Sequence, residues 1–270
     1  MQSAAVIRWP AEAIWEQIAP ILPNFTVEVL PEIDSTNTEL MRRAKAGQIE
    51  PILLVAEKQT AGRGRLGREW HDLAQRTGTL PALTFSLGLP LSSINWSGLS
   101  LAVGVSIATS LHADLGLKWP NDLWLNDRKL AGILIETCVA GSQRYVVIGV
   151  GINIVAPSDD LSATQATLRT PAAWLQELLP AITAADALQR VMLPLVQDVL
   201  QFSQYSFAPY QRRFDALDVL KSRKVSVSGN AHIERLEGIG MGVNAVGEFL
   251  VQTEQGQMTI NSSEVSVKPL

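Results

Sequence analysis

Three arginines lie among three glycines in one short stretch of the chain, Gly62-Arg63-Gly64-Arg65-Leu66-Gly67-Arg68. Glycine lets backbone amides approach a ligand closely, and an arginine fork grips a carboxylate or phosphate through two hydrogen bonds. The preceding residues 51–56 form an apolar run that predicts a buried strand. The pattern therefore indicates an anion-binding loop that leaves the end of a strand, with an ordinary surface turn as the alternative.

Two common phosphate-binding signatures fit the glycine spacing but not the residues around it. A dinucleotide-binding G-x-G-x-x-G turn follows its strand directly and opens a helix, whereas residues 58–61 intervene here and arginines fill the gaps. A P-loop needs Lys and then Ser or Thr after its last glycine, where this chain has Arg68 and Glu69. Both signatures are rejected.

A second polar cluster follows at Lys118-Trp119-Pro120-Asn121-Asp122. Alternating apolar residues after it, and the turn signal Asn126-Asp127, predict a β-hairpin whose return strand runs over residues 129–135. The turn would bring Lys129 back toward the start of the hairpin. Two lysines, an amide and a carboxylate would then meet at one end of a sheet, although an exposed hairpin with solvated lysines has the same pattern.

A third polar stretch, Asp34-Ser35-Thr36-Asn37, precedes a helical pattern that ends at Gly47. Thr36 and Glu39 have the spacing of a capping box, so these polar side chains could serve only the helix start. A strand over residues 145–154 is apolar enough to be central in a sheet. Its internal glycines indicate either close approach of a ligand or simple packing room.

The remaining pattern predicts an α-and-β chain with a β-rich C-terminus. A short helix over 11–18, a strand over 83–87 and a long buried helix over 96–115 are expected. Helices are expected over 171–214, broken at Pro180, Pro194 and Pro209. Short strands over 224–228, 232–236, 248–252 and 257–260, with turns at 229–230, 238–242 and 254–256, predict a small β-barrel or open sheet.

Composition narrows the class of protein. The 270 residues are 47% hydrophobic and 18% charged with a net charge of −4, which argues against general affinity for nucleic acid. One cysteine, Cys138, excludes a disulfide framework, and three histidines make a zinc cluster implausible. Charged residues interrupt the N-terminal apolar runs, so neither a signal peptide nor a membrane span is expected, and the cytoplasm is the predicted location.

Taken together, the three polar stretches resemble the biotin protein ligases, also called biotin–acetyl-CoA-carboxylase ligases. The resemblance covers roughly residues 30–270 and follows the family's order and approximate spacing. The stretches that carry it are Asp34 to Asn37, Gln59 with Gly62 to Trp70, Lys118 to Gly132 with Glu136, and Gly149-Val150-Gly151-Ile152-Asn153.

The resemblance implies a fold and a domain organisation. The expected fold is α+β, with a mixed, mostly antiparallel sheet backed by helices, of the class II synthetase-like biotin/lipoate ligase type. Residues 1–218 would form the catalytic domain, with a short N-terminal extension over 1–30, and residues 219–270 a small barrel like a Src-homology-3 domain. Some relatives repress transcription through an N-terminal DNA-binding domain, for which the residues before the first motif are too few.

The resemblance also implies a reaction and its participants. Biotin and ATP, with magnesium, would form biotinyl-5′-adenylate, and a lysine of a biotin carboxyl carrier protein, an acetyl-CoA carboxylase subunit, would then take the biotinyl group. No prosthetic group, nucleic acid or membrane is expected, and a sheet edge could pair two chains as a homodimer. A lipoate-protein ligase and a non-catalytic biotin sensor are the alternatives.

Site residues are carried over by position. The expected catalytic residues are Lys129, Arg63, Arg65 and Lys118. The expected biotin contacts are Ser35, Thr36, Asn37, Gln59, Arg63, Gly64, Arg65, Lys129 and Gly132. The expected ATP and adenylate contacts are Arg63, Arg65, Arg68, Trp70, Lys118, Asn121, Asp122 and Asn153, with Asp122 also the candidate magnesium ligand.

One segment departs from the family pattern. Relatives usually follow the tryptophan with a Gly-Asn-Leu strand, where this chain has Gly78-Thr79-Leu80-Pro81. Proline has no backbone N–H, so Pro81 would remove one ladder hydrogen bond where that strand starts.

Overall fold

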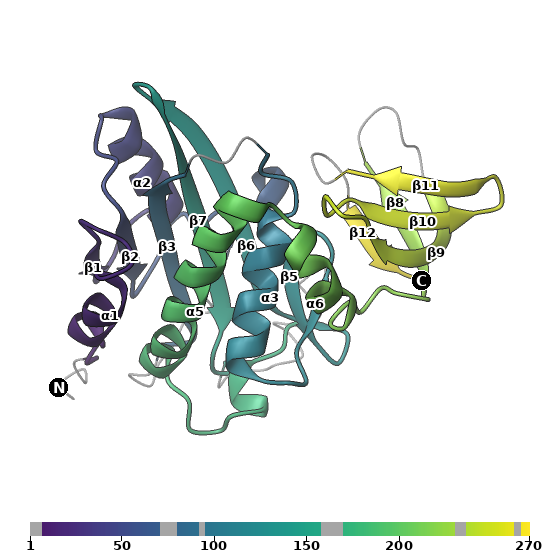
Figure 1. The fold of residues 1–270 in the computed structure, drawn as a ribbon. Helices are drawn as coiled ribbons and strands as arrows, with labels where there is room; N and C mark the ends of the chain where they lie inside the picture. Colours follow the sequence, from purple (N-terminus) through teal and green to yellow (C-terminus); the bar gives the residue numbers. More distant parts are fainter. Residues whose placement is uncertain (1–6, 71–79, 92–94, 158–169, 230–235, 262–265) are drawn as a thin grey trace.

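The computed structural model describes residues 7–70, 80–91, 95–157, 170–229, 236–261 and 266–270, which form two sheets with helices on the larger one (Figure 1). The seven-stranded sheet has the order β1-β2-β3-β7-β6-β5-β4, so β7 lies at its centre as predicted. Only the β1–β2 pair is parallel, which confirms a mixed, mostly antiparallel sheet. Its strands are β1 (Thr26–Leu30), β2 (Ile52–Ala56), β3 (Ala82–Pro90), β4 (Gly116–Lys118), β5 (Asp122–Leu125), β6 (Arg128–Ala140) and β7 (Gln143–Asn153).

Helices α1, α3 and α5 cover one face of this sheet. Successive side chains of a strand point to opposite faces, so Leu53 and Val55 of β2 join the larger core while Leu54 joins a smaller one. Helices α3 and α5 lie side by side across the first face, and α1 packs against α5 (Figure 1). The helices are α1 (Ala11–Ile18), α2 (Thr36–Lys45), α3 (Leu99–Leu111), α5 (Ala184–Tyr205) and α6 (Gln211–Asp215).

The opposite face is covered only in part, by α2. Leu40 and Ala44 of this helix pack on Leu54, Tyr145 and Val147. Further along the same face three positions of the central strands have no side chain. The residues that follow in the alternation are Gly149 and Gly151 on β7 and Gly132 on β6. These glycines leave space on the sheet next to α2.

Helix α2 begins one residue earlier than its sequence pattern suggests. Ser35 is the N-cap, and its side chain accepts a hydrogen bond from the Thr38 amide at 3.4 Å. The predicted capping pair of Thr36 and Glu39 was wrong. The Glu39 carboxylate instead contacts Arg42 and Arg43 in the last turn, as i,i+3 and i,i+4 ion pairs.

The predicted hairpin is confirmed. Asn126 and Asp127 both have positive φ, at 48° and 58°, as a two-residue hairpin turn requires, and Lys129 on β6 lies opposite Trp124 on β5. Pro81 lies just before β3, and its carbonyl accepts from the amides of Ile154 and Val155 at 2.8 and 3.1 Å. The proline therefore adjoins the ladder without interrupting it.

Two helix predictions were wrong in their limits. Helix α3 spans only Leu99–Leu111 of the expected 96–115, and Pro194 lies inside α5 rather than ending it. The capping box of Thr183 with Asp186 starts α5, and its buried apolar face packs on α3 and the sheet. Tertiary packing of that face outweighs the local cost of one interior proline.

The C-terminal sheet is entirely antiparallel, with the order β11-β10-β9-β8-β12. The predicted strand over 232–236 lies, except for Leu236, outside the described residues. Strand β9 occupies the predicted turn at 238–242, because Gly238 and Gly240 lie against the backbone of neighbouring segments and do not bend the chain. Its strands are β8 (Lys224–Ser228), β9 (Leu236–Val243), β10 (Phe249–Thr253), β11 (Gly256–Ile260) and β12 (Ser266–Pro269).

Trp119 connects the large sheet to the C-terminal sheet. Its indole is fully buried, stacks on Phe249 with 5.4 Å between ring centroids, and donates from Nε1 to the Gly247 carbonyl at 3.0 Å. An ion pair between Arg223 and Asp127 of the hairpin turn adds a second contact. Trp119 is therefore a packing residue, and the domain boundary at 218 stays a prediction.

Asp218 is a partly buried acid near this junction. Burial raises the pKa of Asp218 to about 6 from its usual 3.8, against the hydrogen bond from the Leu220 amide and with help from the Asp215 carboxylate. Within the described residues, Oδ2 of Asp218 and Oδ1 of Asp215 are buried without a hydrogen-bond partner. Since the folded-state pKa is the higher one, the folded state loses stability as the pH rises from about 4 through about 6.

Replacing Asp218 by asparagine is therefore expected to stabilise the protein above pH 6. The gain in the free energy of unfolding at pH 8 should be on the order of 2 kcal/mol, because an amide is neutral at every pH. Denaturant titrations should show this gain shrinking toward zero as the pH is lowered to about 4. The exposed Asp114→Asn is the control, and a gain that does not change with pH would contradict the assignment.

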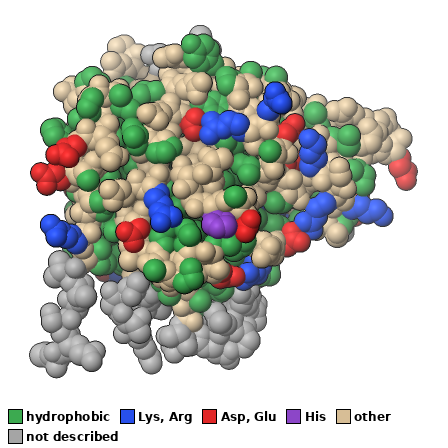
Figure 2. Space-filling view, turned by 60° about the horizontal axis from the view of Figure 1, so that its bottom comes forward, with side chains coloured by type: hydrophobic (Ala, Val, Ile, Leu, Met, Phe, Trp, Pro, Cys, Tyr) green, Lys and Arg blue, Asp and Glu red, His purple; other side chains and the backbone are tan. Residues whose placement is uncertain are grey.

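Surface charge is mixed on the face drawn in Figure 2, where basic and acidic side chains alternate among apolar and neutral ones. Among the described residues, no helix combines the length and the apolar character that crossing a membrane requires.

Candidate active site

An open cavity of about 870 Å³, including its mouth, lies on the face of the large sheet that α2 leaves uncovered. Helix α2, the 62–70 loop, β5, β6 and β7 all contribute to its walls. The lining includes Ser35, Thr36, Asn37, Gln59, Arg63, Gly64, Arg65, Arg68, Trp70, Lys118, Asn121, Asp122, Lys129 and Gly132.

The floor of the cavity requires glycine at two positions of β7, because side chains from other segments lie directly against the strand there. A β carbon added to Gly149 would lie 2.1 Å from Oδ1 of Asn37, and one added to Gly151 would lie 2.5 Å from the Trp70 indole. The strand glycines therefore provide room for Asn37 and Trp70, and these two side chains shape the cavity.

One end of the cavity is lined by uncharged hydrogen-bonding groups. The Thr36 amide donates to Oε1 of Gln59 at 2.8 Å, and Ser86 Oγ lies 2.7 Å from Thr36 Oγ1 and 2.6 Å from Asn37 Oδ1. Ser35, Thr36, Asn37 and Ser86 are all buried. Buried neutral donors and acceptors suit a ligand with polar but uncharged groups.

The loop between β2 and β3 folds back on its own backbone. The Gly64 amide donates to the Arg68 carbonyl at 2.7 Å, and the Trp70 amide donates to the Gly62 carbonyl at 2.9 Å. Leu66 at the tip has φ of 59° and is half exposed. This short turn lays the arginines over the cavity beside Trp70.

Lys129 and Lys118 mark the charged end. Nζ of Lys129 lies 2.8 Å from Oδ1 of Asp122, the pairing that the predicted hairpin implied. Lys118 is buried, with Nζ 5.3 Å from the centre of the Trp124 ring. Burial lowers the pKa of Lys118, and Lys129 adds to this effect while Asp122 opposes it. An entering anion would favour the charged form of Lys118.

Arg65 extends the cationic end from the loop side. Burial lowers the pKa of Arg65, with Asp122 acting in the opposite direction. Its Nη1 lies 3.4 Å from Oδ1 of Asn121, whose own amide donates to the Ile133 carbonyl at 2.8 Å. Five basic and two acidic side chains line the whole cavity, so it attracts an anion.

Every predicted site residue except Asn153 lines this cavity. The side-chain amide of Asn153 donates to the carbonyls of Lys129 and Ala173 at 3.3 and 3.1 Å, so it holds the start of β6 in place. Two residues of this network received no role from the sequence. Ser86, which contacts Asn37, has no feature in the sequence that distinguishes it from other polar residues of an alternating strand. Glu136 contacts Asn37 and Arg63, but long stretches of chain separate it from both, so no local pattern connects them.

The charged end could hold magnesium together with a phosphate ligand. Among the described residues no group of three or more His, Cys, Asp or Glu side chains is arranged around a metal position. Magnesium commonly uses one or two carboxylates plus substrate oxygens, and Asp122 supplies one carboxylate beside the lysines. The donor set therefore fits a magnesium ion that enters with a polyphosphate.

Comparison with known proteins identifies the family. A sequence profile of the biotin/lipoate A/B protein ligase family matches residues 29–153. Over 268 residues the chain is 35% identical to the bifunctional ligase/repressor BirA of Escherichia coli (strain K12), an alignment that covers 92% of this chain and 78% of that protein. The chain belongs to this family.

Two further members agree over almost their whole length. The biotin–acetyl-CoA-carboxylase ligase of Paracoccus denitrificans is 30% identical over 241 residues, covering 88% of this chain and 98% of that one. The structure of biotin protein ligase from Aquifex aeolicus in complex with biotin and ATP aligns with a TM-score of 0.72 and 25% identity, covering 92% of this chain and 100% of that one. The family fold expected from the sequence is confirmed.

Proposed function

We propose that this protein is a biotin protein ligase, which activates biotin with ATP and transfers it to a lysine of a biotin carboxyl carrier protein. One observation carries the proposal: a neutral hydrogen-bonding pocket and a cationic end lie in a single cavity under the arginine loop. The relatives named as ligases for acetyl-CoA carboxylase, and the relative bound to biotin and ATP, support it.

In the first step a biotin carboxylate oxygen attacks the α-phosphorus of ATP and pyrophosphate leaves. Both reactants are anions, and a pair of unit charges 4 Å apart repels by about 4 kcal/mol at an effective dielectric constant of 20. Lys129, Lys118 and Arg65 surround the charged end and would offset this repulsion. The ammonium of Lys129 is the group placed to hold carboxylate and phosphate oxygens together.

In the second step the amine of the acceptor lysine attacks the acyl carbon of the adenylate and AMP leaves. No covalent bond to the enzyme is needed. The adenylate is a mixed anhydride that water can hydrolyse, so the arginine loop and Trp70 would protect it by covering the cavity. Magnesium, when bound with ATP, would neutralise phosphate charge, and Asp122 is the residue that would hold it.

The pocket chemistry favours biotin over lipoate. The ureido ring of biotin needs uncharged donors and acceptors, which Ser35, Thr36 and Gln59 offer, whereas the dithiolane of lipoate has no such groups. We further propose a cytoplasmic enzyme without a nucleic-acid partner, with residues 219–270 as a separate small domain. A homodimer would form through a sheet edge, such as β1 in the large sheet; the other end strand, β4, already pairs with Leu217 and Val219 through Leu117.

Transfer can be tested on a purified carrier domain with one exposed lysine, by probing for protein-bound biotin after incubation with biotin, ATP and magnesium. We expect labelling of the carrier and none of its Lys→Arg variant. A carrier left unlabelled while biotin-dependent pyrophosphate appears would show that the acceptor is a different protein.

Replacing Arg65 by glycine is expected to release the adenylate from the enzyme. Arg65 is the least exposed of the three arginines of the loop, so its loss removes a fixed cation from the adenylate phosphate. The adenylate off-rate should rise by about tenfold or more, for the loss of one charge-assisted hydrogen bond, and unrelated lysines should become biotinylated. An off-rate equal to that of the wild type would count against this role.

A further inference from the structure

Glu136 lies outside the cavity but contacts two residues that line it, Asn37 and Arg63. It lies on β6 opposite Val147, on the same sheet face as Gly132, but it does not line the cavity. Its Oε2 accepts from Nδ2 of Asn37 at 3.0 Å, and its Oε1 lies 3.1 Å from Nη1 of Arg63. One carboxylate thus joins the neutral pocket on α2 to the first arginine of the loop.

The contact fixes the orientation of the Asn37 amide. Both amide hydrogens are used, one toward Glu136 and the other toward the Leu134 carbonyl at 3.3 Å. Oδ1 accepts from Ser86 at 2.6 Å and faces Gly149. Since its hydrogens are taken, Asn37 can offer a ligand only its oxygen, and the orientation of that oxygen depends on Glu136.

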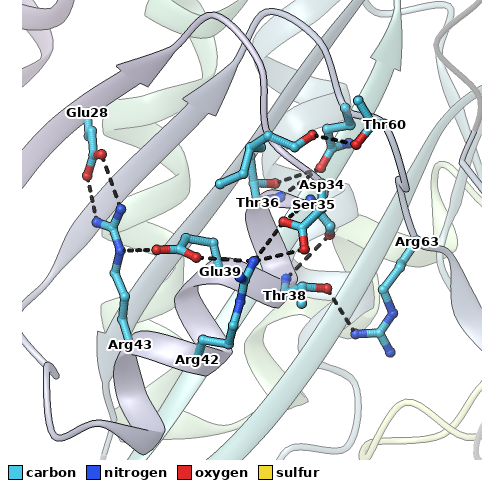
Figure 3. A network of polar contacts seen from close by, with 12 residues as sticks. Glu28, Asp34, Ser35, Thr36, Thr38, Glu39, Arg42, Arg43, Thr60 and Arg63 are labelled. Carbon is cyan, nitrogen blue, oxygen red and sulfur yellow. Dashed lines mark hydrogen bonds and ion pairs between the residues drawn. The ribbon is translucent and has the colours of Figure 1, made fainter.

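The same contact turns Arg63 away from the phosphate end. Its guanidinium lies beside α2, 3.5 Å from Oγ1 of Thr38 (Figure 3), and its side chain is 49% exposed. Paired with Glu136, Arg63 adds little net charge to the cavity. The cations left to face ATP are then Arg65, Arg68 and the two lysines, while Arg63 holds the loop against the neutral pocket.

We infer that Glu136 is a positioning residue for biotin, acting through Asn37 and Arg63 and not by touching the ligand. The inference rests on the proposed function. It assigns Glu136 to the biotin half of the cavity, because neither of its partners belongs to the cluster of Lys118, Asp122 and Lys129. Loss of the carboxylate should therefore weaken biotin binding and leave ATP binding nearly unchanged.

The test uses Glu136→Ala and Glu136→Gln in the full chain. We expect alanine to raise both the Kd for biotin, measured by calorimetry, and the KM for biotin by about tenfold, the size of one lost charge-assisted hydrogen bond. The KM for ATP should stay within about twofold. Glutamine should recover part of the loss, since its carbonyl can accept from Asn37 although it carries no charge for Arg63.

A double-mutant cycle with Arg63→Ala separates the two contacts. If Glu136 acts partly through Arg63, the two alanine substitutions together should raise the Kd for biotin by less than the product of their separate effects. Independent effects would show that the ion pair plays no part in biotin binding and would overturn this half of the inference.

Glu39→Gln is the matched control, because Glu39 is also ion-paired to arginine and its side chain has the same 21% exposure, but it lies outside the cavity. The control should bind biotin like the wild type. An unchanged biotin Kd in Glu136→Ala, or equal rises in the KM values for biotin and ATP, would overturn the inference. If the wild type itself neither binds biotin nor releases pyrophosphate, the proposed function fails instead.

Discussion

Replacing Lys129 by alanine is expected to lower the rate of biotin-dependent pyrophosphate release by at least about 100-fold, the usual cost of losing one donor to developing charge. Nζ of Lys129 lies beside Asp122 at the charged end, where the carboxylate and the α-phosphate must meet. Biotin binding alone should change much less, because the neutral pocket is intact. Single-turnover measurements of adenylate formation would show the loss directly.

Lys58→Ala provides the control for this experiment. Lys58 also forms an ion pair, 2.6 Å from Glu32, but it is exposed and lies outside the cavity. Its loss should leave the rate within about twofold, since exposed ion pairs contribute little. A Lys129→Ala protein that keeps the wild-type melting temperature and adenylates at the wild-type rate would remove Lys129 from its assigned role.

Replacing Gly149 by alanine is expected to distort the neutral pocket. The added carbon would lie 2.1 Å from Oδ1 and 2.8 Å from Cγ of Asn37, so the whole amide must move. Overpacking of this kind costs about 1–3 kcal/mol. The affinity for biotin should fall by about 10- to 100-fold, and calorimetry would measure it.

A second substitution distinguishes overlap from a general fault in β7. Asn37→Ala removes the atoms that the new methyl group would meet, so the double variant should be more stable than Gly149→Ala alone. It should still bind biotin poorly, because the amide is missing. If the double variant is the less stable of the two, the overlap with Asn37 is not the cause.

The local signals in the sequence predicted much of the fold. The hairpin at Asn126-Asp127 was predictable because its turn chemistry is confined to two residues, and β7 because a long apolar run belongs in the centre of a sheet. The glycines of β9 predict a turn from sequence alone, because close backbone packing and chain reversal favour the same residue. Proline usually ends a helix, but Pro194 lies inside α5, because the packing of this long amphipathic helix outweighs the local cost.

The residues of the cavity were predictable from motifs, while their mutual contacts were not. Lys129 follows Asp122 by only seven positions and lies across one hairpin turn from it, so their proximity followed from the turn. Glu136 reaches Asn37 across 99 positions of sequence, and Ser86 reaches it across 49. Such contacts are fixed by strand register and sheet order, which no local pattern contains.

The central claim is that the neutral and cationic ends of the cavity activate biotin. The most direct measurement is pyrophosphate release from ATP by the purified protein with magnesium, in parallel with biotin, with lipoate and with no added carboxylate, and without any carrier protein. We expect release that depends on biotin. Release with lipoate alone, or none with either acid from a protein that still binds biotin, would contradict the proposed ligase activity.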